Sequence, residues 1–176
     1  MPKKKSVKTE DRETKPRKQK VHQRDKIDFK LSIRDLDWTS KQKDFIKQAL
    51  DKDNRIMFVS GPAGTSKSII SVYCALKLLE RKNISDIIYI RSAVESSDSK
   101  LGYLPGDATE KLHFYNIPFM EKLDELLPPT EIEKLEKDER ISMYPVNYAR
   151  GMNWNAKCII FDEAQNSSLK EIITVL

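Results

Sequence analysis

The run Met57-Phe-Val-Ser-Gly-Pro-Ala-Gly-Thr-Ser-Lys-Ser68 is the firmest motif of this 176-residue chain. It has the spacing G-x-x-x-x-[G/S]-K-[S/T], with Gly61, Ser66, Lys67 and Ser68 at the fixed positions. A phosphate-binding loop needs inward-facing backbone N–H groups, a helix N-terminus facing the anion, a lysine for the β- and γ-phosphates and a hydroxyl for Mg²⁺. The run supplies all four and therefore predicts a P-loop that binds ATP or a close relative.

The position before the lysine is usually glycine, and here it is Ser66. Glycine suits it because the backbone approaches the phosphates with no Cβ in the way. We expect Ser66 to tighten or slightly reshape the loop while binding is retained. The residues expected to hold the nucleotide are Gly61, Pro62, Ala63, Gly64, Thr65, Ser66, Lys67 and Ser68. The alternative is a strand-to-helix turn that uses its glycines for geometry alone.

The segments on either side of the loop indicate an α/β fold. Residues 55–60 form a short apolar run typical of parallel strands that are buried on both faces. Residues 68–81 have the pattern of a largely apolar helix, and residues 86–90 that of a second buried strand. Together they predict a strand, helix, strand unit within a parallel sheet.

The run Ile159-Ile-Phe-Asp-Glu-Ala-Gln165 ends a third predicted strand, at residues 157–162, with two adjacent carboxylates. The order fits a Walker B motif, in which Asp162 holds Mg²⁺, usually through water, and Glu163 activates the attacking water as a general base. The alternative is a strand that ends in ordinary polar loop residues.

Weaker patterns predict the other elements. A helix capped by Thr39 or Ser40 runs to Leu50, and an amphipathic helix over residues 109–127 is broken at Pro118. The remaining expectations are a loop over 92–107, a charged helical turn or two over 131–139, a strand over 141–146 and a final helix capped by Ser167 or Ser168.

Gln42 lies on the helix that precedes the loop. Its amide offers one donor and one acceptor, which suits the edge of adenine and would favour ATP over GTP. A solvated glutamine is the alternative.

Two pairs of residues are expected in the core. Cys74 and Cys158 lie in apolar runs with no CxxC or His/Cys cluster nearby, which is typical of small buried hydrophobes. Tyr148 and Trp154 flank Arg150-Gly151. For these two aromatic residues the alternative is a stacking surface for single-stranded nucleic acid.

The net charge of +5 is concentrated at the N-terminus. Residues 1–26 carry eleven basic and four acidic side chains, a net charge of +7, so that the remaining 150 residues sum to −2. With so few apolar side chains, residues 1–26 are predicted to be a disordered tail, and residues 27–176 the folded domain. The tail is either a solubilising leader or an arm that contacts nucleic-acid phosphates.

Together the motifs resemble the PhoH family, the phosphate-starvation-inducible P-loop ATPases. The resemblance covers roughly residues 39–176. The stretch Lys100–Asp107 is the most diagnostic part, because nucleotide binding in general does not require it. The stretches are Gly61-Pro-Ala-Gly-Thr-Ser-Lys-Ser68, Arg91-Ser-Ala-Val-Glu95, Lys100-Leu-Gly-Tyr-Leu-Pro-Gly-Asp107 with Glu110-Lys111, Arg150-Gly151 and Asp162-Glu-Ala-Gln-Asn166. Ser66 and the short basic leader resemble the versions carried by bacteriophages.

The resemblance implies a RecA-like P-loop NTPase with a parallel sheet flanked by helices, similar to the ATPase core of superfamily 1 helicases. It implies ATP and Mg²⁺ as cofactors, Gln42 as the adenine reader and Gln165 as the γ-phosphate sensor, and some members are thought to act on RNA. Such a core should continue into a sensor strand and an arginine that stabilises the transferring phosphoryl group. Because the chain stops at Leu176, the domain is expected to be incomplete at its C-terminal end, with hydrolysis weakened. Arg91 or Arg150 is a candidate for serving a neighbour's site in a homo-oligomer.

The leading hypothesis is an ATP-binding protein of this kind, which hydrolyses ATP with Mg²⁺ when the missing C-terminal portion is present. The resemblance adds RNA or single-stranded nucleic acid as a candidate partner. The alternative is a nucleic-acid-binding module that uses the basic arm and has a non-hydrolysing nucleotide site. A small-molecule kinase fits less well, because Glu163 and Gln165 suit water activation better than transfer to a metabolite. No run approaches the roughly 18 to 20 apolar residues of a membrane span, and the charged N-terminus has no apolar signal region. A cytoplasmic location is predicted, that of the host if the chain is phage-encoded.

Overall fold

The computed structural model describes residues 27–92 and 108–176, with side chains from residue 116 onward in the second range. The predicted tail at 1–26 and all but the first residue of the predicted loop at 92–107 lie outside the described residues. The diagnostic stretch Lys100–Asp107 lies outside them as well.

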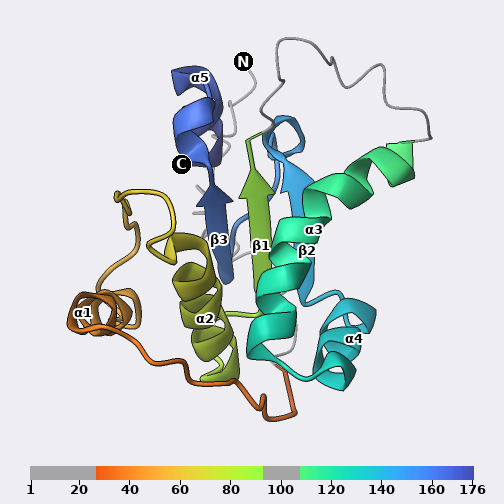
Figure 1. Cartoon of the computed structure of the whole chain (residues 1–176). Helices are drawn as coiled ribbons and strands as arrows, with labels where there is room; N and C mark the ends of the chain where they lie inside the picture. Colours follow the sequence, from red (N-terminus) through yellow and green to blue (C-terminus); the bar gives the residue numbers. More distant parts are fainter. Residues whose placement is uncertain (1–26, 93–107) are drawn as a thin grey trace, which may run out of the picture.

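Three parallel strands form a single sheet at the centre of the described structure (Figure 1). The strands are β1 (Asp86–Arg91), β2 (Ile141–Pro145) and β3 (Lys157–Asp162). β1 lies between the other two, and the register places Arg91 at its end beside Pro145 of β2 and Asp162 of β3. The α/β class and the strands predicted at 86–90, 141–146 and 157–162 are confirmed.

Five α-helices surround the sheet in the described part of the chain, and two short 3₁₀ helices follow β2 and β3. The α-helices are α1 (Ser40–Ala49), α2 (Lys67–Glu80), α3 (Ala108–Leu126), α4 (Pro129–Lys137) and α5 (Leu169–Val175); the 3₁₀ helices are η2 (Val146–Tyr148) and η3 (Ala164–Asn166). The predicted helices at 39–50, 68–81 and 131–139 and the final helix are confirmed. Thr39 caps α1 and Ser168 caps α5, each in a reciprocal capping box.

One face of the sheet carries the main core. α2 and α3 lie across this face (Figure 1), where Ile87 and Tyr89 of β1 pack with Leu76 of α2 and Phe119 of α3 in one buried cluster. Apolar burial of this kind is the main favourable term in folding. It fixes α2 against the sheet, and so sets where the exposed loop before α2 begins the helix.

The opposite face carries a smaller cluster that includes Ile88 and Ile90 of β1, Val146 and Ala149. Trp154 packs partly buried against it, as predicted. Tyr148 is 61% exposed, so its predicted place in the core is wrong. A 3₁₀ helix has three residues per turn, and residues 146 and 149 therefore share the core-facing side while residue 148 points elsewhere.

Residues 55–60 do not form the predicted strand. Ile56, Phe58 and Val59 are 62%, 83% and 41% exposed, and the run is not part of the sheet. Both sides of β1 are already paired, by β2 and β3, and no described strand pairs with residues 55–60. An apolar run is buried as a strand only where neighbouring strands and helices cover it, and here nothing described does so.

α3 continues through Pro118, so the break predicted there is wrong. A proline inside a helix removes one backbone hydrogen bond and costs about 3 kcal/mol. Phe119, Leu123 and Leu126 are fully buried, and their packing offsets that cost by holding the C-terminal half of the helix on the sheet. The helix changes direction along its length (Figure 1).

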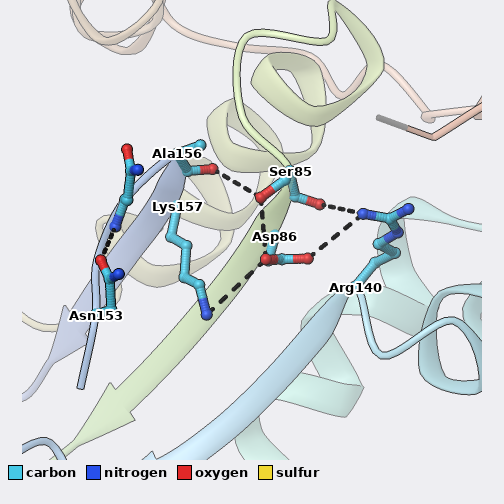
Figure 2. A network of polar contacts seen from close by, with 7 residues as sticks. Ser85, Asp86, Arg140, Asn153, Ala156 and Lys157 are labelled. Atoms are coloured by element: carbon cyan, nitrogen blue, oxygen red, sulfur yellow. Dashed lines mark hydrogen bonds and ion pairs between the residues drawn. The ribbon is translucent and has the colours of Figure 1, made fainter. Parts of the chain in front are cut away.

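A buried carboxylate ties the starts of all three strands together, as Figure 2 shows. Asp86 is 4% exposed and accepts a hydrogen bond from Ser85 Oγ at 3.0 Å. Arg140 Nη1 lies 3.6 Å from its Oδ1, and Lys157 Nζ lies 3.9 Å from its Oδ2. The backbone N–H of Ser85 also donates to the carbonyl of Ala156 at 2.7 Å. This network fixes the starts of the strands, at the opposite end of the sheet from Asp162.

Candidate functional site

The first turn of α2 meets the end of β3 through Ser68 and Asp162. Ser68 Oγ donates to Asp162 Oδ1 at 2.9 Å, across 94 positions of sequence, and the contact is half-buried. Ser68 is delivered by the helix that follows the loop, and Asp162 by the carboxyl end of an edge strand. The structure thus brings together the two residues that the sequence predicts as Mg²⁺ ligands.

The loop before α2 is exposed and has two residues of positive φ. Gly64 has φ +76°, and Ser66, the N-cap residue of α2, has φ +63° and ψ +25°. The left-handed region costs a residue with a Cβ roughly 1 to 2 kcal/mol. This backbone conformation is a second reason for glycine at the position of Ser66, and the sequence reasoning missed it. The Ser66 side chain makes no capping hydrogen bond, so it satisfies none of the backbone N–H groups at this helix N-terminus, where an anion is favoured.

Lys67 folds back onto the loop that precedes it. Its Nζ donates to the carbonyl of Gly61 at 2.9 Å and to that of Pro62 at 2.7 Å. Thr65 Oγ1 donates to the same Pro62 carbonyl at 2.8 Å. The ammonium group is therefore held against the loop by acceptors that phosphate oxygens can replace, because phosphates form stronger, charge-assisted hydrogen bonds.

Glu163 and Gln165 are in contact just beyond β3. Gln165 Nε2 donates to Glu163 Oε2 at 2.5 Å. Glu163 has φ +52° and ψ +33° as the N-cap of η3, a conformation that costs energy for a non-glycine residue and clusters at functional sites. The structure therefore brings the predicted general base and the predicted γ-phosphate sensor together, directly after the predicted Mg²⁺ ligand Asp162.

Tyr89 is a site residue that sequence reasoning missed. Its hydroxyl donates to Asp162 Oδ2 at 2.5 Å, and the residue is 1% exposed. Burial raises the pKa of Tyr89 above its usual value, and the hydrogen bond to Asp162 raises it further, so the hydroxyl keeps its proton. No motif includes Tyr89. The signal that could have found it is the strand register, which pairs Tyr89 with Ile160, two residues before Asp162.

Gln42 lies in the cap of α1, the helix that packs against α2. Its side-chain Oε1 accepts from the backbone N–H of Thr39 at 2.9 Å. The backbone N–H of Gln42 donates to Thr39 Oγ1 at 3.4 Å. To read adenine with both amide atoms, Gln42 would have to release its Oε1 from this cap. Adenine recognition by Gln42 stays a prediction.

The two cysteines are confirmed as part of the packed interior. Cys74 is buried, and Cys158 is half-buried against the same core cluster. Burial raises the pKa of Cys74 to about 12 and that of Cys158 to about 11. Both thiols are therefore neutral near pH 7, which makes them poor nucleophiles and metal ligands.

None of the helices in the described residues has the length and apolar character needed to span a bilayer. Within the same residues, no cluster of three or more His, Cys, Asp or Glu side chains is placed to hold a metal ion. A metal at this site would rely on Ser68, Asp162, water and phosphate oxygens. That donor set fits Mg²⁺, which uses one or two protein oxygens together with substrate phosphates.

A phosphate-binding loop that opens a helix, with its hydroxyl residue bonded to the acidic end of a parallel strand, defines a P-loop NTPase. The sequence model of the PhoH-like protein family matches residues 36–176. The chain belongs to this family.

Individual relatives agree. A PhoH-like protein of Mycobacterium tuberculosis (strain ATCC 25618 / H37Rv) is 37% identical over 134 residues, which cover 76% of this chain and 37% of the relative. One from Bacillus subtilis (strain 168) is 37% identical over 130 residues, 74% of this chain and 40% of the relative. One from Synechocystis sp. is 34% identical over 138 residues, 78% of this chain and 41% of the relative. The matched region thus spans about two fifths of these relatives, and the resemblance stated from the motifs is confirmed.

Proposed function

We propose that this chain binds ATP with Mg²⁺ and hydrolyses it. The observation that carries the proposal is the 2.9 Å hydrogen bond between Ser68 and Asp162, because it joins the phosphate loop to the acidic end of β3. A strand-to-helix turn that used its glycines only for geometry would not need that contact.

Binding is assigned to the loop and the first turn of α2. The backbone N–H groups of Gly61 and of residues 63–66 are assigned to the phosphates, since Pro62 has none, and Lys67 exchanges its two loop carbonyls for β- and γ-phosphate oxygens. Ser68 and Asp162 hold the metal. Bound there, Mg²⁺ neutralises charge that develops on the phosphate oxygens. Gln42 reads adenine once its amide oxygen leaves the α1 cap.

Hydrolysis is assigned to the pair beyond β3. Glu163 accepts a proton from the attacking water, and Gln165, which already donates to Glu163, shifts its amide towards the γ-phosphate. The roles are compatible because a single amide NH₂ group has two donors. One can stay on Glu163 while the other meets a phosphate oxygen.

Phosphate release by the full chain tests the proposal. ATP with Mg²⁺ should be hydrolysed, and excess EDTA should abolish the release. Glu163→Gln should bind ATP as the wild type does and release phosphate about 10²- to 10⁴-fold more slowly, the usual contribution of a general base. Glu171→Gln, in the α5 cap, is the matched control and should keep the wild-type rate. Equal rates for Glu163→Gln and the wild type would contradict the role of Glu163.

A nucleic-acid partner, RNA or a single strand, is a second candidate favoured by two observations. Residues 1–26 carry a net charge of +7, and Tyr148 is 61% exposed close in sequence to the exposed Arg150, as in a base-stacking surface. Filter binding of a single-stranded RNA across a salt series tests this. Deleting residues 1–26 should lower the salt slope, and Tyr148→Ala should weaken binding with the slope unchanged. Binding that neither change affects would exclude this surface.

A further inference from the structure

Tyr89 is anchored on three sides before its hydroxyl reaches the site. It lies on the central strand β1, between β2 on one side and β3 on the other. Its ring stacks on that of Phe119 of α3, with the centroids 4.7 Å apart and the planes 15° from parallel. A ring packed in this way has one position for its oxygen. Asp162 therefore meets a hydroxyl whose place is set by the core.

The two oxygens of Asp162 are held by different groups. Oδ1 accepts from Ser68, and Oδ2 accepts from Tyr89. The Ser68 hydroxyl is the exchangeable partner, because its oxygen must turn to the metal when the metal binds. The Tyr89 hydroxyl has no such second task. The hydrogen bond from Tyr89 to Asp162 can therefore stay in place with and without the metal.

We propose that Tyr89 is a positioning residue that sets the orientation of the Asp162 carboxylate for Mg²⁺. This inference rests on the proposed function. Groups that hydrogen-bond to a metal-binding carboxylate fix its orientation, and their loss typically lowers metal affinity about 10- to 100-fold. Tyr89 thereby connects the metal site to the core, through Phe119 and α3.

The isosteric variant Tyr89→Phe removes the hydroxyl and keeps the stacked ring. ATP binding to the full chain is followed by titration calorimetry, first in EDTA and then over a series of MgCl₂ concentrations. In EDTA the variant should bind ATP within about twofold of the wild type, because phosphate contacts in the loop are untouched. The MgCl₂ concentration that gives half of the Mg²⁺-dependent tightening should rise about 10- to 100-fold.

Tyr73→Phe is the matched control. Tyr73 is a buried tyrosine of α2 whose hydroxyl donates to a different carboxylate, that of Asp35. Loss of the Tyr73 hydroxyl should change the free energy of unfolding about as much as loss of the Tyr89 hydroxyl does. It should leave the Mg²⁺ midpoint unchanged. Phe119→Leu is a second variant that keeps the Tyr89 hydroxyl and loosens its ring. It should raise the midpoint by about 2- to 10-fold, the worth of one aromatic pair.

The outcomes separate the two proposals. A wild-type chain whose ATP affinity does not respond to Mg²⁺ contradicts the proposed function, and the role of Tyr89 with it. A wild type that responds, together with Tyr89→Phe at the same midpoint, overturns the role of Tyr89 alone and leaves its hydroxyl a structural group. A midpoint shift as large in Tyr73→Phe as in Tyr89→Phe would also overturn it, because the effect would then come from general loosening of the core.

Discussion

Ser68 Oγ donates to Asp162 Oδ1 at 2.9 Å, and this bond joins the loop-bearing helix α2 to the edge strand β3. The two oxygens are already adjacent, as a shared cation requires. The proton between them is the part that must move when a cation binds. The contact thus links the loop before α2 and the acidic end of β3 in one half-buried pair.

Ser66→Gly should stabilise the protein. Ser66 has φ +63°, so glycine relieves roughly 1 to 2 kcal/mol of left-handed strain. Glycine also costs roughly 0.5 to 1 kcal/mol, because it raises the conformational entropy of the unfolded chain. The net gain in the free energy of unfolding is about 0.5 to 1 kcal/mol, measured by urea denaturation.

Gly64→Ala is the mirror control for that change. Gly64 has φ +76° and no atom within 4 Å of an added Cβ, so alanine meets conformational strain without a clash and should lose about 1 kcal/mol. If both substitutions changed stability in the same direction, loop strain would not be the cause.

The P-loop motif indicates that position 66 favours glycine because the backbone there approaches phosphate. The structure adds another reason, the positive φ of Ser66. Motif spacing fixes which residues line the loop, whereas its backbone dihedrals depend on how the loop enters α2. The same limit applies to Tyr89, whose contact with Asp162 arises from strand register and a stacked ring rather than from any local pattern. Two elements 73 positions apart must already be paired before that contact exists.

Hydrophobic pattern predicted β1, β2 and β3, because each is covered in the described structure. The same pattern misled at residues 55–60, where Phe58 is 83% exposed. Composition shows that a run can be buried as a strand, but burial also needs a neighbour in the sheet. The error at Pro118 is similar. The low helix propensity of proline predicted a break, but the burial of Phe119 and Leu123 stabilises a continuous helix.

Asp86→Ala should destabilise the fold without changing the site. The substitution leaves Arg140 and Lys157 without their shared buried carboxylate, and breaking a buried ion pair from one side costs about 3 kcal/mol. Urea denaturation measures the loss. ATP affinity under native conditions should stay at the wild-type value, because the network lies at the starts of the strands and Asp162 at the end of β3.

Glu80→Ala is the control for Asp86→Ala. It removes the Lys77–Glu80 pair, which is near the surface at 4.0 Å, and pairs of this kind contribute within about 0.5 kcal/mol. A loss for Asp86→Ala no larger than that of Glu80→Ala would show that the Asp86 network is energetically equivalent to a surface pair.

Stability should fall as the pH rises above about 9. The folded-state pKa values of Cys74 and Cys158 are raised to about 12 and about 11 from a usual value of 9.0. The unfolded chain therefore releases these protons first. Their contribution is fully present below pH 9 and is lost as the pH rises towards 11 to 12, with a limiting slope of about 1.4 kcal/mol per pH unit for each thiol. Urea denaturation at pH 8, 9 and 10 measures the slope.

The slope should flatten in Cys74→Ala, whatever that change does to stability at pH 8. Buried tyrosines such as Tyr89 contribute to the slope over the same interval, because their unfolded-state pKa lies near 10. The difference between the slopes of the wild type and Cys74→Ala therefore isolates the thiol of Cys74. An identical slope in Cys74→Ala and the wild type would show that Cys74 is not protected by burial.

Titration calorimetry of ATP with Mg²⁺ into the wild type, Lys67→Ala and Lys77→Ala shows whether the loop before α2 binds the nucleotide. Lys67 donates to the loop carbonyls of Gly61 and Pro62, while Lys77 lies further along the same helix beside Glu80. Loss of a charged hydrogen-bonding partner of phosphate should weaken binding about 10- to 100-fold in Lys67→Ala, and Lys77→Ala should bind as the wild type does. Equal affinity for ATP in Lys67→Ala and the wild type would contradict the assignment of this loop as the nucleotide site.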